Sequence, residues 1–466
     1  MAPIFSRPIV LNADQERVFS RITTDVYKDN KVCMALILYV GGAAGTGKSV
    51  LIKQLTNHIG IQHVLLLGTT SMCAKSIGGG TVHSVLKLNI FTEEKDDEPI
   101  PPHPFLKLLI IDEISMCDAK LLRRIEKRMR QLMRNDLPFG GCTTVFFGDI
   151  LQIPPVPEKG PDGHPTKIDY VFECKKTIFV QYNNSFSAPL WQNLVQYEEL
   201  EIVMRQEEDP EFAERLKRWR VGEYNEDDNV FLNRKAMDWV FIDQDTITTN
   251  LCEQFKSEGN KMVLSFTNSA VFNYNKNITE KLFHPDHLYQ ISHSTYTIHK
   301  GVTSSTHVPR FTVGEGSRVL INKNSRGSRL VNGEICTVRN IKSIDNRVVS
   351  LDVTLDSTQE TQELEPIKSE LVLGSDTHSW KIEYQIQPAY ALTYHKSQGQ
   401  TLDAVFLDAG KNLQPAMFYV GASRVRCSDH LFVLNYNATD SISADPYALE
   451  EYKRLRMTIG LPPLPT

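Results

Sequence analysis

The chain has 466 residues, 41% of them hydrophobic and 23% charged, and its 51 Lys and Arg against 56 Asp and Glu give a formal net charge of −5. This composition excludes a largely disordered chain, and the slight acidity excludes a protein that coats nucleic acid through bulk positive charge. At roughly 100–200 residues per domain, the length predicts two to four domains. Two acidic runs, at 93–98 and 223–228, account for the negative sign, and we expect both to be solvated surface loops.

The eight cysteines are scattered and include no CxxC pair. This spacing favours reduced thiols over a zinc site or a disulfide framework. No apolar run approaches the roughly 18 residues that a membrane helix needs, and the first residues resemble neither a signal peptide nor an organelle transit peptide. We therefore expect an intracellular protein in a reducing compartment, with no membrane segment and no secretory or evident mitochondrial targeting segment.

Four short apolar runs in the first half predict buried parallel strands, at 35–40, 64–67, 108–111 and 144–147. Each is followed directly by glycine or polar residues, and ligands of open α/β sheets bind at the carboxyl ends of the strands. The sequence therefore predicts one shared site at four strand ends. Residues 117–134 have apolar side chains at helical spacing among basic ones, which predicts an amphipathic helix.

A similar pattern returns in the second half. Residues 262–266, 389–392 and 404–407 predict core strands, and 415–425 predicts a helix opened by proline. Between them, residues 305–385 alternate in short apolar runs separated by turn residues, which predicts a β-rich insert. The expected plan is α/β, with two domains, the second of them interrupted by the β-rich module.

A phosphate-binding pattern follows the first predicted strand. Residues 42–49 match G-x-x-x-x-G-K-[ST] in full. The glycines let successive backbone N–H groups point at phosphate oxygens, at the start of a helix whose dipole favours anions. We expect Lys48 to meet the β- and γ-phosphates and the Ser49 hydroxyl to bind Mg²⁺. The residues of this P-loop are Gly42, Ala43, Ala44, Gly45, Thr46, Gly47, Lys48 and Ser49.

Acidic and amide side chains follow two further strands. Asp112 is placed to hold the Mg²⁺ shell and Glu113 to polarise a water for attack on the γ-phosphate. Two adjacent acids on a surface helix would usually be only solvated charge, but these two follow a buried strand. Gln152 follows the strand at 144–147 and is a candidate to bond the γ-phosphate or the attacking water, although a glutamine in a turn is usually only a turn residue.

Six segments carry a family resemblance: GGAAGTGKS, IIDEISM, PFGG with FFGDILQIPPV, MRQEED, TYHKSQGQTLD and YVGASRVR. They occur in the order found in superfamily 1 DNA helicases of the PIF/RecD type, and the chain most resembles the PIF-type group. The resemblance implies two RecA-like P-loop domains in tandem, with an SH3-like barrel as the β-rich insert. The implied boundaries are 1–200 for the first domain, with a small wedge-like insert near 85–105, 201–304 and 386–466 for the second, and 305–385 for the barrel.

The resemblance also implies roles for single residues. Gln15 matches the glutamine that reads the adenine edge, and Gly399 matches a glycine near the γ-phosphate. Arg205 and Arg424 match two arginines that reach the γ-phosphate, a role that suits the planar guanidinium fork, although a lone arginine is more often a surface charge. The residues expected to contact single-stranded DNA are Thr70, Thr81, His83 and Ser84 in the first domain and Thr393, His395 and Lys396 in the second.

The implied activity is that of an ATP-dependent DNA helicase that uses Mg²⁺, moves 5′-to-3′ on single-stranded DNA and unwinds duplex. The direction comes only from the resemblance. The implied partners are single-stranded DNA and duplex junctions, and we expect a monomer that acts in DNA replication, repair or recombination, in a nucleus or at a viral replication site. Three alternatives stay open: a translocase or remodeller that separates no strands, an inactive nucleic-acid-binding scaffold, and a small-molecule P-loop kinase. The expected catalytic residues are Lys48, Glu113, Gln152, Arg205 and Arg424.

Overall fold

The computed structural model describes most of the chain. The described ranges are 10–28, 35–89, 99–157, 166–173, 179–182, 186–236, 243–299, 302–323, 330, 332–345, 347–372, 377–410, 413–436 and 442–462. Within these ranges no helix combines the length and the apolar character of a membrane span, and the cysteines are free thiols. The acidic run at 93–98 and the middle of the wedge-like insert expected near 85–105 lie outside the described residues.

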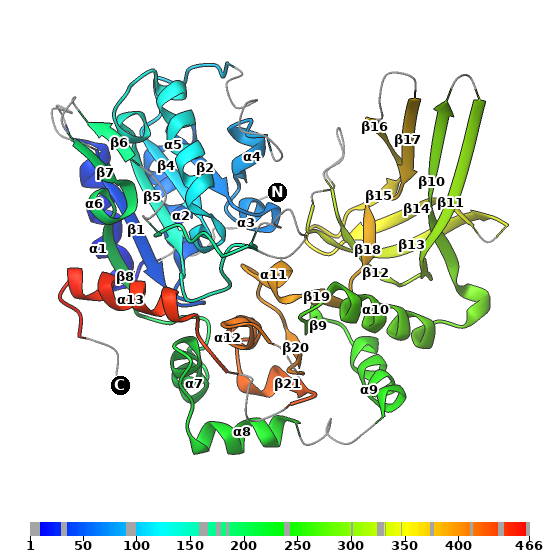
Figure 1. The fold of residues 1–466 in the computed structure, drawn as a ribbon. Helices are drawn as coiled ribbons and strands as arrows, with labels where there is room; N and C mark the ends of the chain where they lie inside the picture. Colours follow the sequence, from blue (N-terminus) through cyan, green and yellow to red (C-terminus); the bar gives the residue numbers. More distant parts are fainter. Residues whose placement is uncertain are drawn as a thin grey trace, which may run out of the picture.

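The first domain is built on a six-stranded parallel sheet in the order β3-β2-β4-β5-β1-β8 (Figure 1). The four strands predicted in this half are all present, and β3 and β8 extend the sheet at its two edges. The strands are β1 Ile37–Gly42, β2 Val64–Gly68, β3 Gly80–Thr81, β4 Leu108–Asp112, β5 Thr143–Gly148 and β8 Gln196–Leu200.

Helices cover both faces of this sheet because its side chains alternate between two apolar clusters. Leu38 and Val40 point into a cluster shared with α1 and α2. Ile37 and Tyr39 point into the opposite cluster, shared with α5. The helices of this domain are α1 Ala13–Val26, α2 Lys48–Ile59, α3 Ser71–Ser76, α4 Val82–Val85, α5 Ala119–Met133 and α6 Leu190–Leu194. Strands β6 Phe179–Tyr182 and β7 Phe186–Pro189 form a separate two-stranded antiparallel sheet between β5 and α6.

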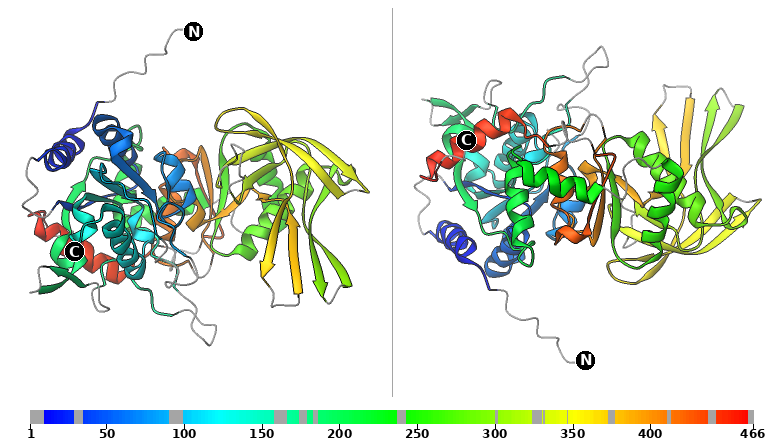
Figure 2. Two further views of the ribbon diagram at one scale, coloured as in Figure 1. Left: turned by 90° about the horizontal axis from the view of Figure 1, so that it is seen from above. Right: turned by 90° about the horizontal axis from the view of Figure 1, so that it is seen from below.

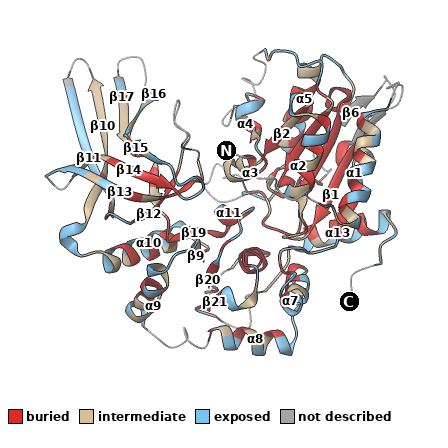
Figure 3. Cartoon of the chain, turned by 180° about the vertical axis from the view of Figure 1, so that it is seen from behind, coloured by how far each residue is buried: buried red, intermediate tan, exposed pale blue. Residues whose placement is uncertain are grey.

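The second domain has a four-stranded parallel sheet in the order β19-β9-β20-β21. Its strands are β9 Lys261–Ser265, β19 Ala391–Thr393, β20 Ala404–Asp408 and β21 Leu431–Leu434. Its helices are α7 Pro210–Arg220, α8 Glu226–Ala236, α9 Gln244–Lys256, α10 Asn268–Leu282, α11 Tyr394–Ser397 and α12 Met417–Ala422. The two sheets are two RecA-like domains in tandem, and their strands are largely buried (Figure 3).

One acidic run differs from the prediction. We expected 223–228 to be a solvated loop, but its last three residues begin α8, and Asp228 is fully buried. Its carboxylate accepts hydrogen bonds from Arg215 and Arg218, which replace the water that it loses. The run of acids gave no sign of this because both arginines belong to α7, the preceding helix.

The β-rich insert is a curled nine-stranded sheet in the order β16-β17-β10-β14-β13-β12-β18, with β11 paired to β10 and β15 to β14. Its strands are β10 Tyr289–His299, β11 Val302–Val313, β12 Arg318–Ile321, β13 Ile335–Ile344, β14 Arg347–Leu355, β15 Thr361–Leu364, β16 Ile367–Val372, β17 Thr377–Glu383 and β18 Ile386–Pro388. The sheet begins at Tyr289 and ends at Pro388, outside the 305–385 that we expected. The polar first strand explains this, because its half-exposed side chains give no apolar run. Figure 2 shows this module at one end of the molecule and the first domain at the other.

The C-terminal helix α13, Pro446–Thr458, lies on the first domain rather than in the second, where we expected 386–466. Its residues Ala448, Tyr452 and Leu455 belong to the apolar cluster that also holds α5. Glu451 accepts a hydrogen bond from Trp191 Nε1 at 2.9 Å. The apolar spacing of α13 predicts a helix with one buried face, but spacing alone does not say which domain that face covers.

Candidate functional site

The P-loop connects β1 to α2 through backbone conformations that require glycine. Gly45 and Gly47 have φ of +86° and +80°, values that side chains with a Cβ rarely adopt. An added Cβ at Gly47 would overlap the amide nitrogen of Gln15. The start of α2 is thereby left open for an anion at its N-terminus.

Gln15 lies directly against this loop. It is the third residue of α1 and forms a capping box with Asn12. Its Nε2 donates to the main-chain oxygens of Thr46 at 3.3 Å and Gly47 at 3.4 Å. The capping box fixes the first turn of α1, so the amide of Gln15 reaches the P-loop from a rigid element.

Half-buried Lys48, at the start of α2, and buried Asp112 and Glu113, at the end of β4, form one charged cluster. Lys48 Nζ donates to the main-chain oxygens of Gly42 at 2.7 Å and Ala43 at 3.0 Å. Burial lowers the pKa of Lys48, although the nearby carboxylates oppose this. Burial raises the pKa of Asp112, and burial together with the Asp112 charge raises the pKa of Glu113 to about 7.

Glu113 has an unusual backbone and an unsatisfied side chain. Its φ is +54°, a conformation that is uncommon outside glycine and clusters at functional sites. Its N–H donates to Asp112 Oδ1 at 2.9 Å, and its main-chain oxygen accepts from Thr69 Oγ1 at 3.1 Å. Its buried Oε2 has no hydrogen-bond partner within the described part of the chain. A buried, unsatisfied carboxylate oxygen marks a place for a hydrogen-bonding ligand.

The second domain meets this cluster through the segment after α11. Gln398 Nε2 donates to Gln152 Oε1 at 3.5 Å, and a Cβ built at Gly399 would lie 3.8 Å from Glu113 Oε1. Gln152 and Gln398 are both buried. Sequence reasoning missed Gln398, although its place beside Gly399 in the TYHKSQGQTLD segment was an available signal.

Arg205 and Arg424 lie together beside the P-loop. Arg205 N–H donates to Gly45 O at 3.2 Å, while Arg424 Nε donates to Val420 O at 2.7 Å. Burial and the nearby Arg424 lower the pKa of Arg205 to about 9. Burial also lowers the pKa of Arg424, against the attraction of Glu113. Two neighbouring guanidinium groups that repel each other, one buried and one half-buried, form a site for a polyanion.

Oxygen ligands for Mg²⁺ are available in the same place. Ser49 is the second residue of α2, and Asp112 ends β4 with a buried carboxylate. Mg²⁺ binds through one or two protein oxygens together with substrate phosphates and waters. The hydroxyl of Ser49 and the carboxylate of Asp112 fit such a shell beside the P-loop.

The residues expected to contact DNA lie at the carboxyl edges of the two sheets. Thr70 and Thr81 are the N-caps of α3 and α4, and His83 and Ser84 belong to α4. Thr393 ends β19 and precedes His395 and Lys396 in α11. Thr393 and Lys396 line a cavity of about 520 Å³ between α10, β11 and β18.

A turn of the β-rich module contacts the first domain at α3. Glu334 forms an ion pair with Lys75, and Asn332 Nδ2 donates to Ser71 Oγ at 3.3 Å. Between them, Gly333 has φ of +91°, and an added Cβ would overlap the sulfur of Met72. The module and the first domain are thus joined beside the expected DNA contacts.

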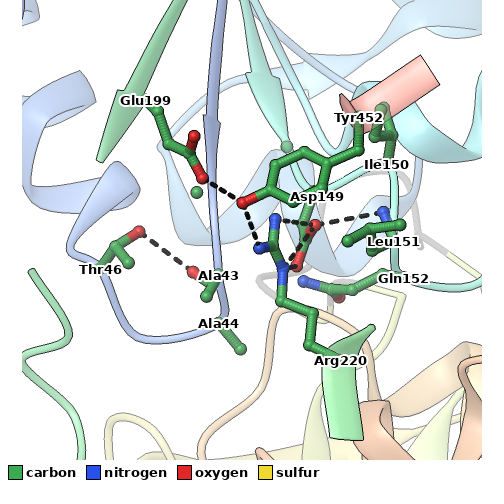
Figure 4. A network of polar contacts seen from close by, with 12 residues as sticks. Ala43, Ala44, Thr46, Asp149, Ile150, Leu151, Gln152, Glu199, Arg220 and Tyr452 are labelled. Atoms are coloured by element: carbon green, nitrogen blue, oxygen red, sulfur yellow. Dashed lines mark hydrogen bonds and ion pairs between the residues drawn. The ribbon is translucent and has the colours of Figure 1, made fainter. Parts of the chain in front are cut away.

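A second polar network, missed by sequence reasoning, lies beside the P-loop (Figure 4). Asp149 and Arg220 form a buried ion pair, with Arg220 Nη2 donating to Asp149 Oδ1 at 2.8 Å. Tyr419 OH donates to Asp149 Oδ2 at 3.3 Å and accepts from Ala44 N–H at 2.9 Å. Arg220 also donates to the hydroxyl of Tyr452 at 2.9 Å. No local sequence signal joins these residues.

Comparison with known proteins gives consistent matches. Residues 10–229 match the family model described as PIF1-like helicase. The chain is 26% identical over 428 residues to the ATP-dependent DNA helicase Pif1 of Bdellovibrio bacteriovorus, covering 90% of this chain and 88% of that protein. It is 25% identical to the ATP-dependent DNA helicase PIF1 of Emericella nidulans, over 90% of this chain and 60% of that protein. The chain therefore spans less than two thirds of the length of this fungal relative.

Solved structures share the fold over nearly the whole chain. The crystal structure of a Pif1 helicase from Bacteroides in complex with ADP-AlF3 and ssDNA has a TM-score of 0.72 at 20% identity, covering 97% of this chain and 98% of that one. The Pif1 helicase of Candida albicans has a TM-score of 0.70 at 22% identity, covering 96% of this chain and 100% of that one. At these identities the likeness shows a shared fold.

Proposed function

We propose that this chain, whose residues 10–229 match the family model described as PIF1-like helicase, is a DNA helicase driven by ATP hydrolysis. The observation that carries the proposal is the meeting of the P-loop and Glu113 with two arginines, the half-buried Arg205 and the buried Arg424. Such an arrangement suits a nucleotide held between two domains, where closure completes the hydrolytic site.

Each group has a proposed role in hydrolysis. The P-loop N–H groups and Lys48 hold the phosphates, and Gln15 contacts the adenine. Ser49 and Asp112 would hold Mg²⁺, which would supply positive charge against the phosphates when bound. Glu113 accepts a proton from the attacking water through its unsatisfied oxygen, and Gln152 orients that water. Arg205 and Arg424, with Gly399 beside them, stabilise charge on the transferred phosphoryl group.

We propose that single-stranded DNA crosses the carboxyl edges of both sheets beneath the β-rich module. Hydroxyl, imidazole and ammonium groups grip phosphates without reading sequence, and the two groups of candidate contacts provide all three. The strand would pass from Thr70, Thr81, His83 and Ser84 in the first domain to Thr393, His395 and Lys396 in the second. Loss of the γ-phosphate contacts lets the two domains separate. If the two domains bind the DNA strand alternately, each cycle of ATP hydrolysis moves the protein one step along it.

The remaining parts of the proposal rest on the family. We propose that translocation runs 5′-to-3′, that the partners are single-stranded DNA and duplex junctions, and that the protein acts as a monomer in a reducing compartment, at a nucleus or a viral replication site. The free thiols of the described cysteines are in keeping with such a compartment.

ATP hydrolysis and strand separation test the proposal together. We expect ATPase activity that single-stranded DNA stimulates, and unwinding of a duplex with a 5′ tail but not of one with a 3′ tail. Glu113→Gln should abolish hydrolysis and leave DNA binding measurable. Hydrolysis by Glu113→Gln at the parent rate would overturn the mechanism. Stimulated ATPase without unwinding of either duplex would indicate the translocase instead, and DNA-independent turnover would indicate a small-molecule kinase.

The buried charges disfavour an inactive scaffold. A protein that only bound DNA would gain nothing from burying Glu113 and Arg424 and half-burying Lys48 and Arg205, because each loses hydration. A phosphate-release assay on the parent protein distinguishes the two functions directly.

A further inference from the structure

Arg220, the last residue of α7, holds Asp149 with a full guanidinium fork. Its Nε donates to Asp149 Oδ1 at 3.1 Å and Oδ2 at 3.0 Å, and its Nη2 donates to Oδ1 at 2.8 Å. Both side chains are buried. Because the fork is planar and the carboxylate is planar, this contact fixes the orientation of the carboxylate as well as its position.

The Asp149 carboxylate in turn builds the segment that carries Gln152. Asp149 Oδ1 accepts from Leu151 N–H at 3.1 Å, and Asp149 O accepts from Gln152 N–H at 2.9 Å. These two bonds close a tight turn directly after β5. The direction in which Gln152 leaves the backbone therefore depends on where the carboxylate points.

Arg220 is itself positioned by the C-terminal helix. The hydroxyl of Tyr452 accepts from Arg220 Nη1 at 2.9 Å, and its ring centroid lies 4.5 Å from the guanidinium carbon (Figure 4). Tyr452 OH also donates to Glu199 of β8. Arg456, one turn later in α13, donates to Glu199 Oε2 at 2.8 Å. Helix α13 thus holds Tyr452 in a buried position, where its hydroxyl both accepts and donates a hydrogen bond.

We propose that Arg220 and Tyr452 are positioning residues for Gln152, and that α13 thereby sets the rate of hydrolysis from outside the nucleotide site. The inference rests on the proposed function. Asp149 directly follows β5, Arg220 ends α7, and Tyr452 lies in α13. Helix α7 packs in the core of the second domain. A movement of α7 relative to α13 is therefore transmitted through Arg220 to the turn that holds Gln152.

Removal of one hydroxyl tests this chain of contacts. Tyr452→Phe keeps the ring against the guanidinium and loses the hydrogen bond. We expect kcat for DNA-stimulated ATP hydrolysis to fall about tenfold, because small misplacements of reacting groups are costly, while KM for ATP stays within about twofold. The control is Tyr447→Phe, the same change on the same helix at a half-exposed side chain, which should leave both constants at the parent values.

Arginine variants separate charge from geometry. Arg220→Lys keeps a positive charge beside Asp149, so we expect its unfolding temperature to exceed that of Arg220→Gln. A lysine lacks the fork, so kcat of Arg220→Lys should remain at least about tenfold below the parent. Full recovery of kcat in Arg220→Lys would overturn the proposal, because charge alone would then be sufficient.

Amide hydrogen exchange gives a readout independent of hydrolysis. We expect the amides of Leu151 and Gln152 to exchange faster in Tyr452→Phe than in the parent or in Tyr447→Phe. Unchanged exchange, or a kcat equal to the parent value, would overturn the inference. If Tyr452→Phe exchanges faster than the parent but the parent hydrolyses no ATP, the positioning contacts stand and the proposed function is refuted.

Discussion

Arg205 Nη1 donates to the main-chain oxygen of Ser423 at 2.7 Å, so one arginine of the proposed nucleotide site is bonded to the residue that precedes the other, Arg424. The sequence separates these arginines by more than two hundred positions. Their link means that a change at either one alters the placement of both.

Loss of either arginine should therefore remove hydrolysis more than nucleotide binding. We expect Arg205→Ala and Arg424→Ala each to lower kcat by about a thousandfold, the scale of an arginine that stabilises phosphoryl-transfer charge. Steady-state phosphate release measures this. Arg234→Ala, at an exposed position of α8, is the control. An Arg424→Ala protein with near-parent kcat would contradict the role.

Gln15 should act on substrate affinity rather than on chemistry. We expect Gln15→Ala to raise KM for ATP about tenfold with kcat nearly unchanged, since a contact made equally in the ground and transition states alters only binding. Comparing ATP with GTP in the same assay checks base selection. A variant that loses kcat and keeps KM would show that Gln15 serves the P-loop backbone, to which it donates.

The turn at Gly333 should control how the β-rich module meets the first domain. Gly333→Ala adds a Cβ that overlaps Met72 in α3, so we expect the Kd for a single-stranded oligonucleotide to rise about tenfold as the contact opens, about 1.4 kcal/mol. Gly460→Ala has the same positive-φ strain with nothing within 4 Å of the added Cβ, and it should bind like the parent. Equal affinity in the two variants would show that this contact plays no part in DNA binding.

Asp228 should contribute stability through its two arginines. We expect Asp228→Asn to lower the free energy of unfolding by about 2 kcal/mol, because it removes charge-assisted hydrogen bonds to Arg215 and Arg218. Asp227→Asn, exposed on the same helix, is the matched control for denaturant unfolding. Equal stability of the two variants would argue that the buried pairs add nothing.

The contribution of Asp228 should also depend on pH. Burial opposes its ionisation, but hydrogen bonds from Arg218 and Arg215 outweigh burial, and the pKa of Asp228 is lowered. A lowered folded-state pKa gives stability that is complete above the unfolded carboxyl pKa of about 3.9 and is lost as pH falls through the folded value. The stability gap between parent and Asp228→Asn should therefore be constant near neutral pH and shrink below about pH 4. A gap that persists at lower pH would contradict the assignment.

The proposed nucleotide site can be inferred from sequence because its signals are local. Buried strands were visible as apolar runs, and the P-loop as glycines at positions where φ is positive. The positions of Asp112 and Glu113 followed from the end of a buried strand. The choice of Arg205 and Arg424 came only from the family resemblance, because local sequence does not indicate which partner a charged side chain contacts.

The sequence by itself determined the two parallel sheets, the P-loop, and the place of Asp112 and Glu113 at the end of a strand. These features depend on backbone conformation and on short apolar runs, which neighbouring residues set. Only the tertiary structure decided that α13 covers the first domain, that β10 extends the β-rich module, and that Arg220 joins Asp149 to Tyr452. Those last contacts span 71 and 232 positions of the chain. A buried charge must find a partner, but the sequence does not say where, because that depends on which surfaces meet when the domains pack.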